Sequence, residues 1–289
     1  MKKNWKELVR SALEEDIGPG DITATLVPEG SAPVRAIIIA KERGVIAGLS
    51  MARMSFLSLS PRVKFQAFKK DGQEVLPGEK VLEVSGHLPV ILSAERTSLN
   101  FLSRISGIAT LTRKFVEKSA GTRADIFDTR KTTPTLRALE KYAVKAGGGK
   151  NHRFGLFDGI LIKDNHISAL SASKKVRTRL DAITRLLKEA RKKKRKGIPV
   201  EVEVENIKEA LTAASGGADI ILLDNMSPEN VRAVRKELIR MGFKGKTEVS
   251  GGVTLQNVRA YALAGVDRIS IGRLTHSAPS LDFSLEIIP

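Results

Sequence analysis

The sequence predicts an α/β barrel preceded by a smaller domain, and two patterns carry this prediction. Up to about residue 95 the chain consists of short candidate strands separated by turn signals such as Asp71-Gly72 and Pro77-Gly78. From Ala124 onward a unit recurs in which a short apolar strand, a polar or glycine-bearing loop and a helical stretch follow one another. Strands that alternate with such helices pair in parallel, and six or more units favour a closed barrel over an open sheet.

The first part of the chain predicts a helix over Trp5–Glu15 and strands over Val34–Ala40 and Val63–Lys70. A long helix is then expected over Ala94–Lys118, long enough to cross from one domain into the next. Its apolar residues recur with a helical period, at Leu99, Leu102, Ile105, Ile108 and Leu111.

The repeated units predict the elements of the barrel in order. The expected strands are Asp125–Asp128, Gly159–Ile162, Val200–Val204, Asp219–Leu223, Thr247–Ser250 and Arg268–Ile271. The expected helices lie between them, at Thr135–Ala146, Lys174–Lys196, Ile207–Ala214, Pro228–Met241 and Leu255–Ala264.

Composition narrows the possible classes of protein. The chain has 289 residues that are 42% hydrophobic, which excludes a disordered protein, and its net charge is 49 − 32 = +17. The absence of cysteine excludes disulfides, thiolate metal sites, iron–sulfur clusters and cysteine nucleophiles. We expect a cytoplasmic protein with no membrane association, because the amino terminus lacks the apolar core of a signal peptide and the longest apolar run, Ala36–Ala40, is too short to span a bilayer.

Ionisable or phosphate-compatible residues follow or end all six predicted barrel strands. Active sites of such barrels lie at the carboxyl ends of the strands, so this coincidence favours a functional site over solvated loops, turn formers or helix caps. The third strand carries Glu201, Glu203 and Glu205 at alternate positions, which places them on one face. The other ends carry Thr129-Arg130-Lys131-Thr132, Lys163-Asp164-Asn165-His166, Asp224-Asn225, Ser250-Gly251-Gly252 and Gly272-Arg273.

A glycine-rich segment, Gly147–Gly149, comes before a further set of basic residues. It is not a P-loop, because it follows a helix and Asn151 stands where Ser or Thr must hold magnesium. We interpret it as a loop that delivers Lys150, His152 and Arg153 toward the second strand. With Arg130, Lys131 and Lys163, these residues predict a cationic pocket beside the acids, suited to a substrate with several carboxylates and a phosphorylated partner.

The metal expected at the site is magnesium. The four histidines show no paired metal-ligand spacing, so a transition-metal site is not expected. Glu203 and Asp224 are candidate Mg2+ ligands that would act jointly with phosphate oxygens.

The strongest basic run, Lys188–Lys196, has two interpretations. It resembles a nucleic-acid patch, but it also fits a solvated helix end that complements the helix dipole before Gly197 and Pro199. Aromatic residues make up only 4% of the chain, which argues against single-strand stacking. We therefore expect no nucleic-acid partner.

Several motifs occurring in order along the chain resemble the quinolinate phosphoribosyltransferase family. They are GDIT (20–23), ERTSLNFLSRISGIAT (95–110), DTRKTTPTLRALEKYAVKAGGGKNHR (128–153), DGILIKDNHI (158–167), EVEVEN (201–206), LLDNM (222–226), VSGGV (249–253) and IGRLTHS (271–277). The resemblance implies phosphoribosyl transfer from phosphoribosyl pyrophosphate to quinolinate with decarboxylation to nicotinate mononucleotide, a step of NAD biosynthesis. It also implies an amino-terminal α+β sandwich domain (1–108, completed by 275–289) on an incomplete α/β barrel (109–274), and a homodimer or higher homo-oligomer that shares its active sites.

The resemblance also assigns roles by motif. Arg130, His152, Arg153 and Lys163 are similar to the quinolinate ligands, and Arg96 to a cation donated across the dimer. Lys131 is similar to a pyrophosphate contact, and Glu203 and Asp224 to the acids near ribose and Mg2+. The catalytic set is therefore expected to be Glu203, Asp224, Lys131 and Lys163. The 5-phosphate cradle is expected at Ser250, Gly251, Gly252 and Gly272.

Other functions compete with this one. Within the same superfamily they are a nicotinate-specific phosphoribosyltransferase and a paralogue found beside molybdate transport genes; the dense cation set favours a dicarboxylate substrate. A nucleic-acid-binding protein predicts steeply salt-dependent duplex binding. A structural interaction protein would not place ionisable groups at six strand ends.

Overall fold

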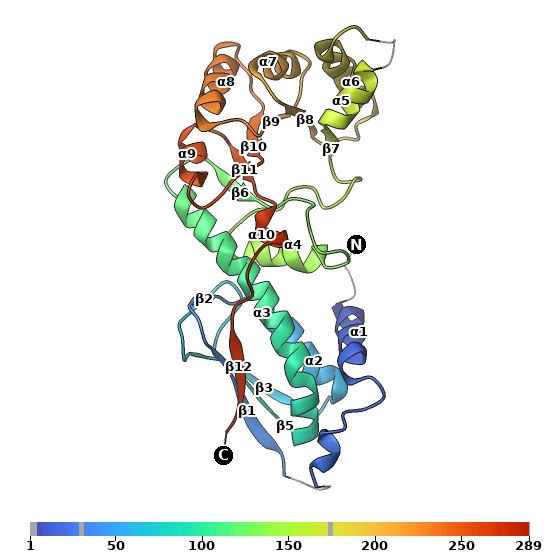
Figure 1. The fold of residues 1–289 in the computed structure, drawn as a ribbon, viewed down its shortest axis with the longest axis vertical. Coiled ribbons are helices and arrows are strands. Elements are labelled where there is room, and N and C mark those ends of the chain that lie inside the picture. The colour runs from blue at the N-terminus through green and yellow to red at the C-terminus, as the bar shows by residue number, and fades with distance from the viewer. Residues whose placement is uncertain (1–4, 29–31, 173–175, 289) are drawn as a thin grey trace. The chain divides into compact units, whose positions relative to one another are not determined.

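The computed structural model describes residues 5–28, 32–172 and 176–288. The chain forms two compact units: unit 1 contains residues 1–113, 134–148 and 274–289, and unit 2 contains residues 114–133 and 149–273 (Figure 1). Helix α3 (Leu88–Ser119) includes the whole of the helix predicted at 94–118 and runs from unit 1 into unit 2.

Unit 1 is built on a four-stranded antiparallel sheet with the order β12-β1-β5-β3. Its strands are β1 (Val34–Ala40), β3 (Lys64–Ala67), β5 (Lys80–Gly86) and β12 (Phe283–Ile288). A two-stranded sheet is formed by β2 (Gly44–Val45) and β4 (Glu74–Val75). The helices are α1 (Trp5–Ile17), η1 (Ala24–Leu26), α2 (Leu49–Leu59), α4 (Arg137–Ala146), α10 (Arg273–His276) and the first part of α3.

The core of unit 1 lies between one face of the larger sheet and helices α2 and α3. Ile38 of β1, Phe56 of α2 and Leu102 of α3 belong to one cluster of buried side chains. Strand β12 pairs with β1 along its length, from Arg35 opposite Ile288 onward, so residues near the end of the chain complete this sheet.

Unit 2 is a parallel α/β structure with the strand order β6-β11-β10-β9-β8-β7. Its strands are β6 (Asp125–Phe127), β7 (Ile160–Ile162), β8 (Val200–Val204), β9 (Ile220–Asp224), β10 (Lys246–Ser250) and β11 (Arg268–Ser270). Its helices are α5 (Asp164–Ser171), α6 (Arg179–Lys193), α7 (Ile207–Ser215), α8 (Pro228–Arg240) and α9 (Val258–Leu263).

The barrel is incomplete, and the closed barrel predicted from periodicity is wrong. Among the described residues β6 and β7 form the two edges of the sheet and do not pair with each other. The chain leaves unit 2 between them, because residues 134–148, which include α4, belong to unit 1. The fold class implied by the family resemblance, an incomplete α/β barrel with a smaller α+β domain, is confirmed.

The predicted helix 174–196 differs most from the structure. Residues 173–175 lie outside the described part of the chain, and α6 begins only at Arg179, after a Thr178 cap that accepts a hydrogen bond from the Asp181 N–H at 3.1 Å. A separate helix, α5, starts directly after β7, where the Lys163 N–H donates to Nδ1 of His166 at 3.0 Å. The sequence pattern did not reveal this short helix.

Two aspartates fix the beginnings of neighbouring barrel strands. Asp219 comes just before β9 and accepts the N–H of Val200, the first residue of β8, at 2.8 Å. Asp267 comes just before β11 and accepts the N–H of Thr247 in β10 at 2.9 Å and its hydroxyl at 3.1 Å. Each carboxylate therefore ties its own strand to the adjacent one.

Asp267→Ala is expected to destabilise the protein by about 1–3 kcal/mol at pH 7, because it leaves the buried Thr247 N–H without an acceptor. Burial tends to raise the pKa of Asp267, but the Thr247 N–H and the Arg123 charge outweigh it and lower the pKa. A depressed folded-state pKa stabilises above the unfolded value of about 3.9 and ceases to do so as pH falls through the folded value. In urea titrations the difference from wild type should be constant above about pH 5 and shrink below pH 4. A difference that grows at low pH would contradict this account.

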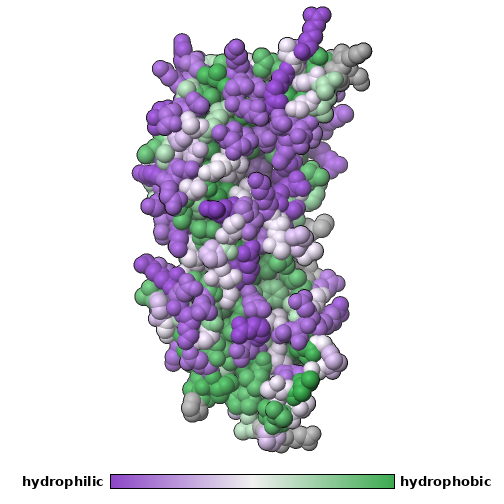
Figure 2. All heavy atoms as spheres, in the orientation of Figure 1, coloured by the Kyte–Doolittle hydropathy of each residue, from purple (hydrophilic) through white to green (hydrophobic). Residues whose placement is uncertain are grey.

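The described part of the chain has no helix long and apolar enough to cross a membrane. Hydrophilic side chains cover most of the face of unit 2 shown in Figure 2. The basic run at 188–196 lies at the end of α6, where Arg191 donates to the Gly217 carbonyl at 2.5 Å and Lys194 pairs with Asp219 at 2.9 Å. These contacts fit the interpretation of the run as a helix end.

Candidate functional site

A cavity of about 560 Å3 opens at the carboxyl ends of the unit 2 strands. It is the place at which barrel enzymes carry their active sites, because the loops after the strands converge there. Its walls are formed by Thr129, Arg130, Lys131, His152, Arg153, Leu161, Lys163, Glu203, Leu222, Asp224, Asn225, Glu248, Ser250, Gly251, Gly252 and Ser270.

Of the residues to which the family resemblance assigns a role, all line this cavity except Arg96 and Gly272. Arg96 lies in unit 1, exposed on α3. Gly272 follows β11 and is not part of the cavity wall. Lys150, expected to face the same site, instead pairs with Asp125 at 2.6 Å. Most other candidates lie at or just after the carboxyl ends of β6 to β10, which is why their proximity could be predicted from the strand ends. His152 and Arg153 come instead from the loop between α4 and β7.

Arg153 is the most constrained cation of the cavity. Its Nη1 donates to the Gly159 carbonyl at 2.9 Å, while its buried Nε has no hydrogen-bond partner among the described residues. Burial lowers the pKa of Arg153, and the neighbouring charge of Arg130 lowers it further. Two neighbouring guanidinium groups form a site for an anion, whose binding would relieve their repulsion.

Two carboxylates face the cavity from adjacent strands, Glu203 from β8 and Asp224 from the end of β9. Burial raises the pKa of Glu203, and the charge of Asp224 raises it further. Burial also raises the pKa of Asp224, despite a hydrogen bond from Asn225 Nδ2 at 2.7 Å and the charge of Lys131. Carboxylates whose pKa is raised by burial are stabilised by a cationic partner, either a metal ion or a positive charge that develops on a substrate.

The loops after β9 and β10 contact each other at the predicted phosphate cradle. Asn225 has a left-handed backbone (φ 52°) and its N–H donates to the Ser250 carbonyl at 3.0 Å. Gly251 has φ 89°, and a Cβ there would lie 2.1 Å from Oδ1 of Asn225. Glycine is therefore required at 251, and the loop leaves backbone N–H groups near the cavity, as phosphate sites do.

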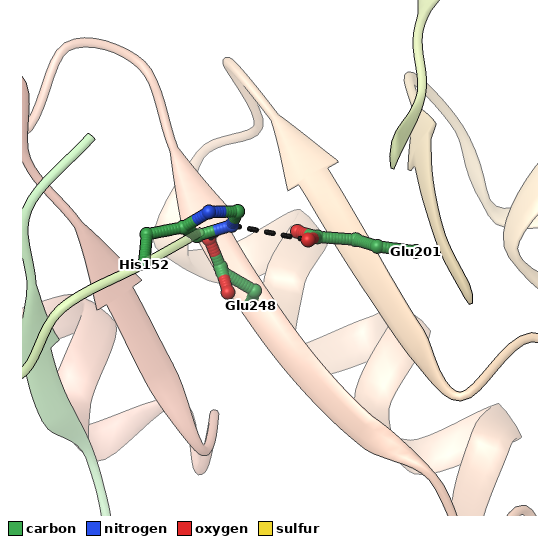
Figure 3. Close-up of side chains that lie close together, drawn as sticks. All are labelled: His152, Glu201 and Glu248. Carbon is green, nitrogen blue, oxygen red and sulfur yellow. Dashed lines mark ion pairs between the residues drawn. The ribbon is translucent and has the colours of Figure 1, made fainter. Parts of the chain in front are cut away.

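His152 is held by two buried acids, as Figure 3 shows. Its Nε2 lies 3.0 Å from Oε2 of Glu201 and 3.4 Å from Oε1 of Glu248. Burial alone would lower the pKa of His152, but the hydrogen bonds to these carboxylates outweigh it and raise the pKa to about 10. The expected consequence is a ring that keeps a proton on Nε2 at neutral pH.

The ligand atoms of these three residues lie within 4.8 Å of one another, close enough to hold a metal ion. Spacing along the sequence could not reveal this cluster, because its members come from a loop and two separate strands. Arg268 Nη1 lies 3.7 Å from Glu248, and a short contact joins the Nε2 of His152 to Glu201. The chain's own cations therefore balance the two acids, and we assign no metal to the cluster.

Sequence reasoning missed Glu248 and Ser270 as residues of the cavity wall. Glu248 could have been found, because it lies two positions before Ser250 on the same strand and so shares its face. Of the three alternating glutamates, Glu201 meets His152 and Glu203 lines the cavity. Glu205 lies beyond the strand and is 3.5 Å from Arg179.

A larger cavity, of about 750 Å3, opens at the opposite ends of the strands and includes Asp219, Lys246 and Arg191 in its walls. Asp219 and Arg191 already have partners there, in Lys194 and the Gly217 carbonyl. Among the described residues, the raised pKa values of Glu203 and Asp224 and the Arg153 Nε without a hydrogen-bond partner favour the smaller cavity as the functional one.

The parallel α/β fold and a cavity lined by cations and acids at the carboxyl ends of its strands define the class as an α/β-barrel enzyme. The chain belongs to the quinolinate phosphoribosyl transferase family: residues 21–106 match the model of its N-terminal domain and residues 108–286 that of its C-terminal domain. The family resemblance read from the sequence motifs is thereby confirmed.

Individual relatives agree over nearly the whole chain. The chain is 43% identical to a probable nicotinate-nucleotide pyrophosphorylase [carboxylating] of Bacillus subtilis, over 98% of this chain and 93% of that one. It is 41% identical to the chloroplastic nicotinate-nucleotide pyrophosphorylase [carboxylating] of Arabidopsis thaliana, over 98% and 82%. The crystal structure of the Ehrlichia chaffeensis nicotinate-nucleotide pyrophosphorylase superposes with a TM-score of 0.89 at 37% identity, covering 100% of both chains.

Proposed function

We propose that this chain transfers the phosphoribosyl group of phosphoribosyl pyrophosphate to the ring nitrogen of quinolinate and decarboxylates the product to nicotinate mononucleotide, a step of de novo NAD biosynthesis. The observation that carries the proposal is the single cavity in which Arg130 and Arg153 face Glu203 and Asp224. The cations match a dicarboxylate, and the acids match a ribose that becomes positively charged.

The chemistry divides between the two sides of the cavity. The quinolinate nitrogen forms a bond to the anomeric carbon as the bond from that carbon to pyrophosphate breaks. Glu203 and Asp224 stabilise the positive charge on the ribose, while Lys131 stabilises the departing anion. The bond from the ring carbon to the carboxylate next to the nitrogen then breaks and releases CO2. The electron pair stays on that carbon, where the adjacent cationic nitrogen stabilises it until a proton from solvent bonds there. Lys163 and Arg153 hold the dicarboxylate in place for both steps.

The acid pair also fits a magnesium ion. Glu203 and Asp224 offer carboxylate oxygens, which Mg2+ prefers, and the pKa of each is raised by burial, so a cation there would be favourable. Bound Mg2+ would supply charge neutralisation for the pyrophosphate group. The 5-phosphate is assigned to Ser250, Gly251, Gly252 and Gly272.

Two further parts of the proposal concern assembly and location. Arg96, exposed on α3, is proposed to enter the active site of a second copy in a homodimer or higher homo-oligomer. We place the enzyme in the cytoplasm, in keeping with a chain that has no cysteine.

The proposed function is tested by measuring pyrophosphate release from phosphoribosyl pyrophosphate in the presence of Mg2+. Release is expected with quinolinate and not with nicotinate, because nicotinate lacks the second carboxylate that the cation set requires. Release with nicotinate alone would instead support a nicotinate-specific enzyme, and release with neither acid would refute the phosphoribosyltransferase assignment.

A further inference from the structure

Four charged side chains form a group inside unit 2, which we call the buried ionic group: His152, Glu201, Glu248 and Arg268. His152 comes from the loop before β7, and the others come from β8, β10 and β11. Glu248 is fully buried and contacts three partners: Nε2 of His152 at 3.4 Å, Oγ of Ser270 at 2.5 Å and Nη1 of Arg268 at 3.7 Å. Glu248 is thus the residue that connects the whole group.

Stability alone does not account for this group. Burying two carboxylates is costly, and well-packed apolar residues in place of a buried ion pair are often as stable or more so. Oε1 of Glu201 and Oε2 of Glu248 are buried without hydrogen-bond partners among the described residues. Burial of these two acids therefore lowers the stability of the fold, and they lie next to a cavity lined by cations.

The acids act on the cavity through His152. The ring is held from both sides, since Nδ1 accepts the N–H of Arg153 at 2.8 Å while Nε2 faces the two carboxylates. The backbone is held as well, because the His152 N–H donates to Oδ1 of Asp128 at 2.8 Å. Fixing this ring therefore fixes the next residue, Arg153, whose guanidinium lines the cavity.

The charge of the acids matters as much as their geometry. Arg130 and Arg153 repel each other, and the charge of Glu201 offsets this effect on Arg153. Both acids contact Nε2 of His152, the residue before Arg153, so their negative charge lies close to the cationic wall and supports it.

We propose that Glu248, acting through His152, is a positioning residue for the cationic wall that binds the dicarboxylate substrate. The expected effect on quinolinate binding rests on the proposed function, whereas the positioning of His152 and Arg153 by Glu248 does not. Glu248 is the clearer residue to test, because Glu201 lies two positions from Glu203 on the same strand and its replacement would disturb both sides of the cavity.

The test is Glu248→Gln, which keeps the size of the side chain and an acceptor for Ser270 but removes the charge. We expect the quinolinate KM to rise about tenfold or more, with the KM for phosphoribosyl pyrophosphate within twofold of wild type. Glu248→Asp, which restores the charge, should recover part of the loss. Glu237→Gln, on the outside of α8 beside Arg240, is the matched control and should leave both KM values unchanged. An unchanged quinolinate KM, or equal losses for both substrates, would overturn the proposal.

A second measurement is made on the wild-type protein and does not depend on activity. The chain has four histidines. In 15N-labelled protein, the imidazole signal of His152 is identified as the one that is missing from the spectrum of His152→Asn. In wild type, His152 should keep a proton on Nε2 from pH 6 to pH 9. Free titration of His152 near the ordinary pKa of about 6.5 would overturn the proposal even if the enzyme is active. If His152 keeps its Nε2 proton over this pH range but the protein has no phosphoribosyltransferase activity, the proposed function is refuted and the positioning role of Glu248 is retained.

Discussion

Arg153→Ala is expected to raise the quinolinate KM by about 30-fold or more, with a smaller change in kcat. Truncating one member of a buried charge pair costs about 2–5 kcal/mol of binding, which corresponds to a factor of about 30 or more. Arg153 meets the conditions for this loss, because its Nε is buried without a partner and its pKa is lowered by burial and by Arg130. Steady-state kinetics with each substrate varied in turn measures the effect.

Two variants make this prediction specific. Arg153→Lys keeps the charge but cannot present a planar pair of donors, so it should recover only part of the affinity. Arg232→Ala, on an exposed position of α8 outside the cavity, removes the same side chain and should leave kinetics unchanged. Quinolinate affinity that is unaltered in Arg153→Ala would show that this side of the cavity does not bind the dicarboxylate.

Asp224→Asn is expected to lower kcat by about 100-fold or more while the quinolinate KM changes little. The ribose becomes positively charged only as its bond to pyrophosphate breaks, so a carboxylate beside it acts mainly on the transition state, where loss of one preorganised electrostatic group costs about 10²–10³ in rate. Asparagine keeps the shape of the side chain and removes its charge. Burial raises the pKa of Asp224, so a nearby positive charge would stabilise its carboxylate form.

A matched control for Asp224→Asn is Asp16→Asn, at an exposed position of α1. Its kinetics should equal those of wild type. Binding of phosphoribosyl pyrophosphate to Asp224→Asn, measured by calorimetry with Mg2+ present, separates binding from turnover. If affinity for phosphoribosyl pyrophosphate falls and kcat does not, Asp224 only binds substrate and its assigned part in the transition state is wrong.

The site was predictable because it depends on a local rule. Loops after parallel strands converge, so Lys163, Glu203 and Asp224 could be expected together without knowledge of the contacts between them. Strand β8 was predicted at its observed bounds, since Val200–Val204 has a strong pattern bounded by Gly197-Ile198-Pro199 and Asn206. Most other strand and helix ends agree with the structure to within two residues, as local signals allow.

The remaining features depend on contacts between distant parts of the chain. Whether β6 and β7 pair is decided by where residues 134–148 pack, which periodicity does not encode. Glu248 and His152 are far apart in sequence, and only the folded barrel brings them to 3.4 Å. The +17 net charge was likewise ambiguous in sequence; in the structure Arg130 and Arg153 line the cavity, while Lys194 neutralises Asp219.

The most direct test of the account is product stoichiometry with quinolinate labelled with 13C in the carboxylate next to the ring nitrogen. The wild-type enzyme with phosphoribosyl pyrophosphate and Mg2+ should form pyrophosphate, nicotinate mononucleotide and labelled CO2 in equal amounts. A mononucleotide that retains the label, or no mononucleotide from quinolinate under conditions in which nicotinate is converted, would contradict the central claim that this cavity binds a dicarboxylate for phosphoribosyl transfer and decarboxylation.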